Sequence, residues 1–188
     1  MDIEKILKDH QETISNFIKQ NRGIILKLTD ELKKRIKSGA TIFVAGNGGS
    51  MADSTHMVTE LMGKFYRKRP PIKAISLGTN PALISAVSND YSYENSFVRE
   101  LSGLAQKGDI FIGISTSGKS KNILKTLEKA REIGCLTVLL TGNHLRKKEK
   151  ISDFLISVPS EDVPRIQECH IFLIHLLCEI LEDELYGN

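Results

Sequence analysis

A histidine and a glutamate able to act as acid and base lie four positions apart in this sequence, at His56 and Glu60. The segment around them has helical spacing, so the imidazole and the carboxylate are expected to share one face of a helix. Just before them, an apolar run at 42–45 leads into the glycine-rich segment GNGGS at 46–50. A strand that enters a helix through such a turn forms an anion site, because backbone N–H groups and the helix dipole favour negative charge. Together these residues indicate chemistry on a small phosphorylated molecule.

A second candidate anion site is rich in hydroxyl groups. The segment GISTSGKS at 113–120 joins an apolar run at 109–115 to a predicted helix at 119–133. It matches the nucleotide-binding P-loop pattern at every position. However, Gly113 lies inside the apolar run, and the later apolar run at 136–141 does not end in the aspartate that would hold magnesium. We therefore interpret the loop as a phosphate cradle of hydroxyl and backbone donors rather than as a nucleotide site.

The first glycine loop carries only part of the dinucleotide-binding fingerprint. Met51 stands where the third glycine of that motif would fall. The second apolar run ends in SLGT at 76–79, without the acidic residue that would bind a ribose. A dinucleotide site is therefore disfavoured, while a purely structural turn remains an alternative for this loop.

A third group of polar residues lies in the C-terminal segment 164–185, which is predicted to be one long helix. Gln167 and His175 are eight positions apart, so they lie about 80° apart around a helix and two turns along it. A polar pair among apolar neighbours is unusual for a plain core helix, although a single histidine in such a segment is more often a core residue. His170 lies on another side of this helix, and we interpret it as structural.

Apolar runs that alternate with segments of helical spacing predict the strands and helices that position these groups. Five strands in alternation with helices predict a three-layer, doubly wound α/β fold with a parallel sheet. In the flavodoxin-like order 2-1-3-4-5, the first and third strands are neighbours, so the two glycine loops would meet where ligands bind. Strands are expected at 41–46, 72–77, 109–115, 136–141 and 154–158, helices at 50–65, 81–88, 93–106, 119–133 and 164–185, and a short basic piece at 144–151.

Two further helices are predicted before the first strand, at 3–20 and 23–37. These helices precede the first strand, so they are not crossover helices of the sheet. Their apolar faces need to be covered, and a partner subunit is a candidate for the covering surface. The chain is therefore expected to be a single domain over residues 1–188, with N-terminal helices at 1–38 and an α/β core at 39–188, and to assemble as a homo-oligomer.

Composition narrows the possible partners. The net charge of +3 and the aromatic content of 6% give no support for nucleic acid binding. No apolar run reaches the roughly 18 residues of a membrane span, and the charged N-terminus is unlike a signal peptide. The cysteines Cys135, Cys169 and Cys178 lie in apolar segments and are predicted to be buried, reduced thiols of a cytoplasmic protein.

With these residues assembled, the chain resembles the sedoheptulose-7-phosphate isomerases (phosphoheptose isomerases) of the SIS sugar-isomerase fold. The resemblance implies aldose–ketose interconversion of sedoheptulose 7-phosphate and D-glycero-D-manno-heptose 7-phosphate. That reaction is the first step toward the bacterial ADP- or GDP-heptose used for lipopolysaccharide or capsule. The motifs that carry it are GNGGS at 46–50, His56-x-x-x-Glu60, Ser88-Asn89-Asp90, SxSGxS at 115–120 and Arg165-Ile-Gln-Glu with His175.

The resemblance also implies roles for individual residues. Glu60 and His175 are expected to be the catalytic acid/base pair. One zinc ion per subunit is expected on His56, Glu60, Gln167 and His175, and the family assembles as a homotetramer with sites between subunits. The residues expected to contact substrate are Asn47, Gly48, Gly49, Ser50, Glu60, Asn89, Asp90, Ser115, Thr116, Ser117, Ser120 and Gln167.

Two departures from the family and two alternative functions remain. Lys119 stands where asparagine is common, and the segment EDVP at 161–164 stands where some members place an aspartate. One alternative function is a binding module like the DnaA-initiator-associating proteins. Those proteins resemble this chain in the loops but lack the pair formed by Glu60 and His175. A sugar-phosphate-sensing regulator is the other alternative, although no DNA-binding domain is attached.

Overall fold

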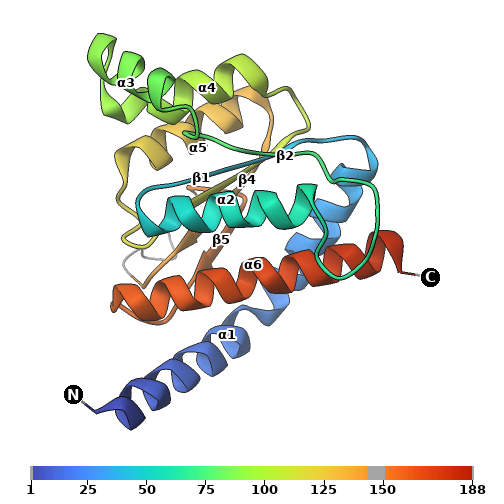
Figure 1. Ribbon diagram of the computed structural model, residues 1–188, viewed down its shortest axis with the longest axis vertical. Coiled ribbons are helices and arrows are strands. Elements are labelled where there is room, and N and C mark those ends of the chain that lie inside the picture. Colours follow the sequence, from blue (N-terminus) through green and yellow to red (C-terminus); the bar gives the residue numbers. More distant parts are fainter. Residues whose placement is uncertain (1, 144–150, 188) are drawn as a thin grey trace.

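One parallel sheet lies between two groups of helices (Figure 1). The computed structural model describes residues 2–143 and 151–187. The basic piece predicted at 144–151 therefore lies, except for its last residue, outside the described residues. This three-layer arrangement confirms the predicted α/β fold class.

Within the described residues, five strands form a sheet in the order β2-β1-β3-β4-β5, and every neighbouring pair is parallel. This confirms the flavodoxin-like order expected from the sequence. Strands β1, β3 and β4 are buried along their whole length, which explains why they read as continuous apolar runs. The strands are β1 Ile42–Gly46, β2 Ala74–Ser76, β3 Ile110–Ser115, β4 Leu136–Thr141 and β5 Phe154–Ser157.

The helices divide between the two faces of the sheet. Helices α1, α2 and α6 lie on one face, whereas α3, α4 and α5 lie on the other (Figure 1). Alternate side chains of β1 supply both cores, since Val44 packs in the cluster of the first group and Phe43 in the cluster of the second. The elements are α1 Ile3–Lys37, α2 Gly49–Met62, α3 Pro81–Asp90, the 3₁₀ helix η1 Tyr93–Asn95, α4 Ser96–Leu104, α5 Lys121–Ile133 and α6 Val163–Tyr186.

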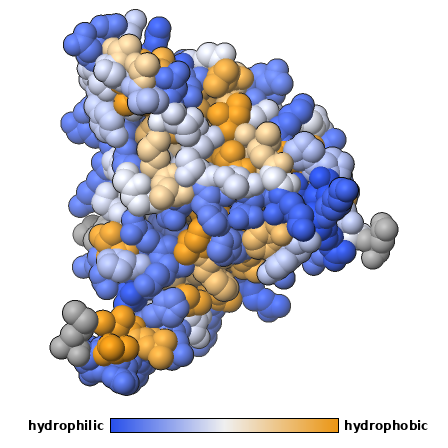
Figure 2. All heavy atoms as spheres, in the orientation of Figure 1, coloured by the Kyte–Doolittle hydropathy of each residue, from blue (hydrophilic) through white to orange (hydrophobic). Residues whose placement is uncertain are grey.

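The N-terminal region forms one helix, so the prediction of two helices at 3–20 and 23–37 is wrong. Helix α1 runs from Ile3 to Lys37 without interruption. Gly23 lies in its middle, but a lone glycine costs a helix only about 1 kcal/mol, and burial of the flanking apolar face outweighs this. The first turns extend beyond the body of the domain (Figure 1), and an apolar patch covers this end (Figure 2).

Several predicted boundaries also shift. The helix expected at 93–106 divides into η1 and α4, and α2 ends at Met62 rather than at residue 65. The three cysteines are buried and unpaired, as predicted. Within residues 2–143 and 151–187, no helix has the length and hydrophobicity needed to cross a bilayer.

Candidate active site

The two glycine loops meet at the carboxyl edge of the sheet. The first joins β1 to α2 and the second joins β3 to α5, and these two strands are neighbours, with Gly46 paired to Ile114. Gly48 has a backbone φ of +56°, a left-handed conformation that glycine adopts without steric cost. It is also the N-cap of α2, so no capping side chain occupies the first N–H groups of that helix.

The second loop is organised by its own hydroxyl groups. Ser115 Oγ and Ser120 Oγ are hydrogen-bonded at 2.8 Å, and the backbone N–H of Lys119 donates to Ser117 Oγ at 3.2 Å. Gly113 lies in the middle of β3, so the first glycine of the apparent P-loop pattern belongs to a strand. The loop itself comprises only residues 116–120. This supports its interpretation as a phosphate cradle, because a P-loop would begin at the first glycine of the pattern.

A pair of asparagines joins the two loops. Asn47 Nδ2 donates to Asn122 Oδ1 at 3.0 Å, and Asn122 Nδ2 donates back to Asn47 Oδ1 at 2.9 Å. Tyr93 Oη also donates to Asn47 Oδ1, at 2.8 Å. Asn122 and Tyr93 were not predicted as site residues, because their relation to Asn47 depends on strand order and not on local spacing.

The acid and base candidates come together from α2 and α6. His56 Nε2 lies 2.9 Å from His175 Nε2 and 3.4 Å from Glu60 Oε1. The side chains of His56 and Glu60 are partly exposed, so both remain open to a ligand. The two imidazoles are close enough to share one proton, with one Nε2 donating and the other accepting. The structure therefore gathers the predicted catalytic pair around His56.

Gln167, the remaining predicted metal ligand, lies on α6 nearer to its N-terminus than His175. Helices α2 and α6 run side by side in the same direction (Figure 1). A methyl group added at Gly49 would lie only 2.3 Å from Gln167 Nε2. Glycine at position 49 therefore lets the amide of Gln167 approach the first loop closely. Gln167 thus lies at the start of α2, and His175 lies beside His56 further along.

Other predicted substrate contacts are not joined to the acid/base group by direct bonds that the structure describes. Asn89 Nδ2 donates to Asp90 Oδ1 at 3.0 Å at the end of α3, and both side chains are exposed. Ser50 is buried in the first turn of α2. Thr116 is half-buried in the second loop.

Two further titratable groups lie on the helices of the site. Burial raises the pKa of the Asp53 carboxyl to about 6, with His56 acting in the opposite direction. Sequence reasoning did not single out Asp53, which lies one turn before His56. His170 is buried, as expected of a structural residue. Burial lowers its pKa to about 4, although a contact with the Thr141 carbonyl partly opposes this.

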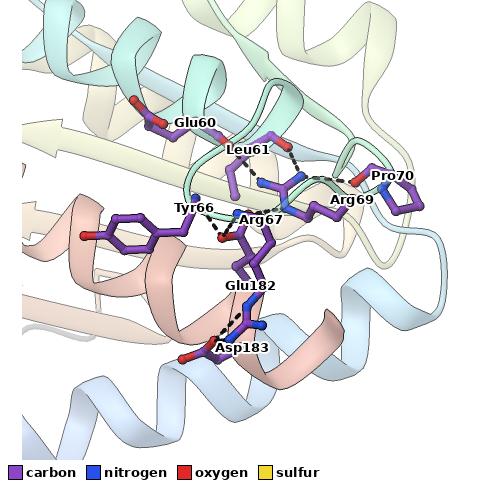
Figure 3. Close-up of polar contacts among 8 residues, drawn as sticks. All are labelled: Glu60, Leu61, Tyr66, Arg67, Arg69, Pro70, Glu182 and Asp183. Carbon is purple, nitrogen blue, oxygen red and sulfur yellow. Dashed lines mark hydrogen bonds and ion pairs between the residues drawn. The ribbon is translucent and has the colours of Figure 1, made fainter. Parts of the chain in front are cut away.

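A buried ion pair fixes the end of α2 that carries Glu60 (Figure 3). Arg69 Nη2 donates to the Glu60 carbonyl and Nη1 donates to the Leu61 carbonyl, both at 2.8 Å. These are carbonyls of the last helical turn, which need partners outside the helix. Arg69 Nε also donates to Glu182 Oε1 at 3.0 Å, and both side chains are only 2% exposed. The guanidinium therefore caps α2 and ties it to α6.

The donor set suits zinc, although it is not yet arranged around one point. Two imidazole nitrogens and a carboxylate oxygen are common zinc ligands. Two ligand atoms of a tetrahedral zinc lie roughly 3.3 Å apart, given bonds of about 2.0–2.1 Å. The separations of 2.9 Å and 3.4 Å around His56 Nε2 are close to this value. Within the described residues, however, no three His, Cys, Asp or Glu side chains already form a metal-binding group.

The chain is similar in sequence to proteins of one family over nearly its whole length. The sequence profile of the SIS domain matches residues 7–142. A phosphoheptose isomerase of Thermodesulfovibrio yellowstonii is 40% identical over 190 residues, covering 99% of this chain and 94% of that protein. Phosphoheptose isomerase 2 of Campylobacter jejuni is 44% identical over 185 residues, covering 98% of this chain and 88% of that protein.

Solved structures agree with the sequence relatives. The phosphoheptose isomerase of Neisseria gonorrhoeae superposes with a TM-score of 0.87 at 28% identity, covering 96% of this chain and 97% of that one. The phosphoheptose isomerase of Francisella tularensis gives a TM-score of 0.85 at 28% identity, covering 97% and 100%. From its sequence and its fold, the chain belongs to the phosphoheptose isomerase family of SIS-domain proteins, a family of aldose–ketose isomerases.

Proposed function

We propose that this chain interconverts sedoheptulose 7-phosphate and D-glycero-D-manno-heptose 7-phosphate through an enediol intermediate. The observation that carries the proposal is the meeting of His175 from α6 with His56 and Glu60 from α2. This group lies on the helix that begins at an anion-binding glycine loop. His56 is seven residues beyond Gly49, which is about 10 Å along a helix. The reacting carbons of an extended sugar phosphate can therefore lie beside His56 while other parts of the chain reach the first loop.

The phosphate end of the substrate is assigned to the second loop. Ser115, Ser117 and Ser120 supply hydroxyl donors there, and the N-terminus of α5 adds backbone N–H groups and the positive end of its dipole. Asn47 and the backbone of Gly48 face the same edge from the first loop. These neutral donors bind a dianion without requiring the exposed side chain of Lys119.

The reaction moves one proton between C1 and C2 of the sugar. A base removes the proton from C1 of the ketose while an acid protonates the carbonyl oxygen on C2, which gives the enediol. The same two groups then return a proton to C2 and remove one from the oxygen on C1. We assign these tasks to Glu60 and His175, and each positioned acid or base contributes about 10² to 10⁴ in rate.

A zinc ion is the cofactor that we propose for this site. Its ligands would be His56, Glu60, Gln167 and His175. His56 and His175 would supply imidazole nitrogens, and Glu60 would supply a carboxylate oxygen. When bound, zinc would polarise the carbonyl and hydroxyl oxygens of the sugar as a Lewis acid. The support for this proposal is the donor chemistry and the approach of His175 and of Glu60 to His56.

We also propose a homotetramer in which the N-terminal part of α1 is covered by another subunit. Ile3 and Leu7 are 71% and 53% exposed, and Ile6 is exposed as well. Three apolar side chains at the end of one helix are an unfavourable surface for a monomer. A cytoplasmic location and a role at the start of heptose synthesis for lipopolysaccharide or capsule complete the proposal, and both follow from the family resemblance.

The test is turnover of sedoheptulose 7-phosphate by metal-free and zinc-loaded protein, followed by NMR of the product in D₂O. We expect the aldose product, with deuterium at C2 from exchange of the enediol proton. No product from either form would overturn the proposal. That outcome would favour a non-catalytic binding module, which has no use for the group formed by Glu60 and His175.

A further inference from the structure

The 3₁₀ helix η1 connects the two glycine loops through separate contacts. Tyr93 Oη donates to Asn47 Oδ1 at 2.8 Å, which attaches η1 to the first loop. The next residue, Glu94, pairs with Lys121 Nζ at 2.9 Å and with Lys125 Nζ at 2.7 Å. These lysines begin α5, the helix that follows the second loop. Hydrogen bonds from Lys125 and Lys121 lower the pKa of Glu94 to about 2, so Glu94 is charged at neutral pH.

The direction of each hydrogen bond around Asn47 follows from its partners. The backbone N–H of Ile123 can only donate, and it lies 3.0 Å from Asn122 Oδ1. The oxygen of Asn122 is thereby identified, and its Nδ2 donates to the oxygen of Asn47. Since that oxygen is an acceptor, the hydroxyl of Tyr93 must donate its only hydrogen to it.

This network leaves the oxygen of Tyr93 as an unused acceptor. The amide of Asn47 has used both lone pairs of its oxygen and one of its two N–H groups, so it offers a ligand one donor. The phenolic oxygen has used its hydrogen and keeps lone pairs that can accept a hydrogen bond. Tyr93 is 54% exposed, so its side chain is accessible. A sugar hydroxyl can donate to the phenolic oxygen of Tyr93 and accept from the remaining N–H of the Asn47 amide.

We propose that Tyr93 is a substrate-specificity residue whose phenolic oxygen accepts a hydrogen bond from a hydroxyl of the sugar chain. This inference rests on the proposed sugar-phosphate isomerase function. The ion pairs of Glu94 hold η1 on α5, so Tyr93 is positioned before the substrate arrives and less ordering is needed on binding. Tyr93 would thus recognise the carbon chain, while the loop at 115–120 recognises the phosphate.

The test compares Tyr93→Phe with Tyr91→Phe in the full-length enzyme. Loss of one neutral hydrogen bond should raise KM for sedoheptulose 7-phosphate by about 3- to 10-fold in Tyr93→Phe, with kcat within about 2-fold of wild type. Inorganic phosphate, used as a competitive inhibitor, should keep its inhibition constant because it has no sugar hydroxyl. Tyr91 is the matched control: it is exposed, and its ring packs 4.8 Å from the Arg99 guanidinium.

Four results would overturn the inference or its basis. An unchanged KM in Tyr93→Phe would reject it while leaving the isomerase function intact. An equal weakening for inorganic phosphate, or the same effect in Tyr91→Phe, would show a general disturbance of the loops instead. Absence of turnover by the wild-type enzyme would overturn the isomerase function and this inference with it. Thermal melting of both variants establishes that they are folded.

Discussion

Replacement of Glu182 by glutamine should strongly destabilise the fold, although it changes the side-chain shape very little. One oxygen of Glu182 accepts from Arg69 Nε at 3.0 Å. The other accepts from the backbone N–H groups of Tyr66 and Arg67, both at 2.8 Å. A glutamine amide has only one oxygen, so its NH₂ group must face a donor in either orientation.

The size of the effect follows from burial. Arg69 and Glu182 are each 2% exposed, and loss of one partner of a buried ion pair typically costs about 3–5 kcal/mol because the other charge is left uncompensated. For a domain of this length, each kcal/mol corresponds to about 2–4 °C in Tm, so Glu182→Gln should melt roughly 6–20 °C below wild type. Thermal and urea unfolding at one fixed protein concentration measure this difference.

The effect should also depend on pH. Burial alone would raise the pKa of Glu182, but hydrogen bonds from Arg67, Tyr66 and Arg69 outweigh it and lower the pKa in the folded state. A carboxylate with a lowered pKa contributes its full stability above the unfolded value of about 4.3 and loses it as pH falls through the folded value. The stability difference between wild type and Glu182→Gln should therefore be constant near neutral pH and narrow below about pH 4.

Asp183→Asn is the matched control, because Asp183 is the next residue of α6. Its ion pair with Arg67 is solvent-exposed, with side chains 59% and 52% exposed, and exposed pairs typically contribute about 0–1 kcal/mol. A loss below about 1 kcal/mol in Glu182→Gln, or an equal loss in both variants, would refute the argument that Arg69 and Glu182 anchor the end of α2.

Three other changes test the loops and the assembly. Lys119→Ala should leave most activity intact, and millimolar ATP should not bind; saturable ATP binding that this variant abolishes would restore the P-loop interpretation. Gly49→Ala should lower kcat/KM by up to about 10²-fold with little change in Tm, because the new methyl group displaces the Gln167 amide; normal kinetics would show that this close approach is unimportant. Deletion of residues 1–20 should lower both the mass measured by light scattering and the activity, whereas a fully active monomer would contradict the proposed tetramer.

The order of the strands could be predicted because each central strand is an apolar run followed by a distinctive turn. Strands β1 and β3 are buried on both faces, so their sequences are unmistakable, and parallel connections allow few arrangements. The meeting of the two glycine loops follows from that order. The approach of His175 to His56 does not, and its prediction came from the family resemblance.

Contacts between distant segments could not be predicted. Arg69 and Glu182 are 113 residues apart in sequence, and no local period relates them. Tyr93 was placed in a longer helix at 93–106, whereas it begins η1 and its hydroxyl contacts Asn47, 46 residues earlier in the chain. The continuity of α1 was also missed, because the apolar pattern was divided into segments at 3–20 and 23–37, whereas packing of the whole helix compensates for one poor helix former in its middle.

The most direct test of the account is the kcat of zinc-loaded wild type, Glu60→Gln and His175→Gln with sedoheptulose 7-phosphate. The account predicts that the wild type turns over and that each variant loses about 10²-fold or more in kcat while still unfolding cooperatively as a folded protein. Near-normal isomerisation by either variant would contradict the assignment of these two side chains as the acid and base that move the proton between C1 and C2.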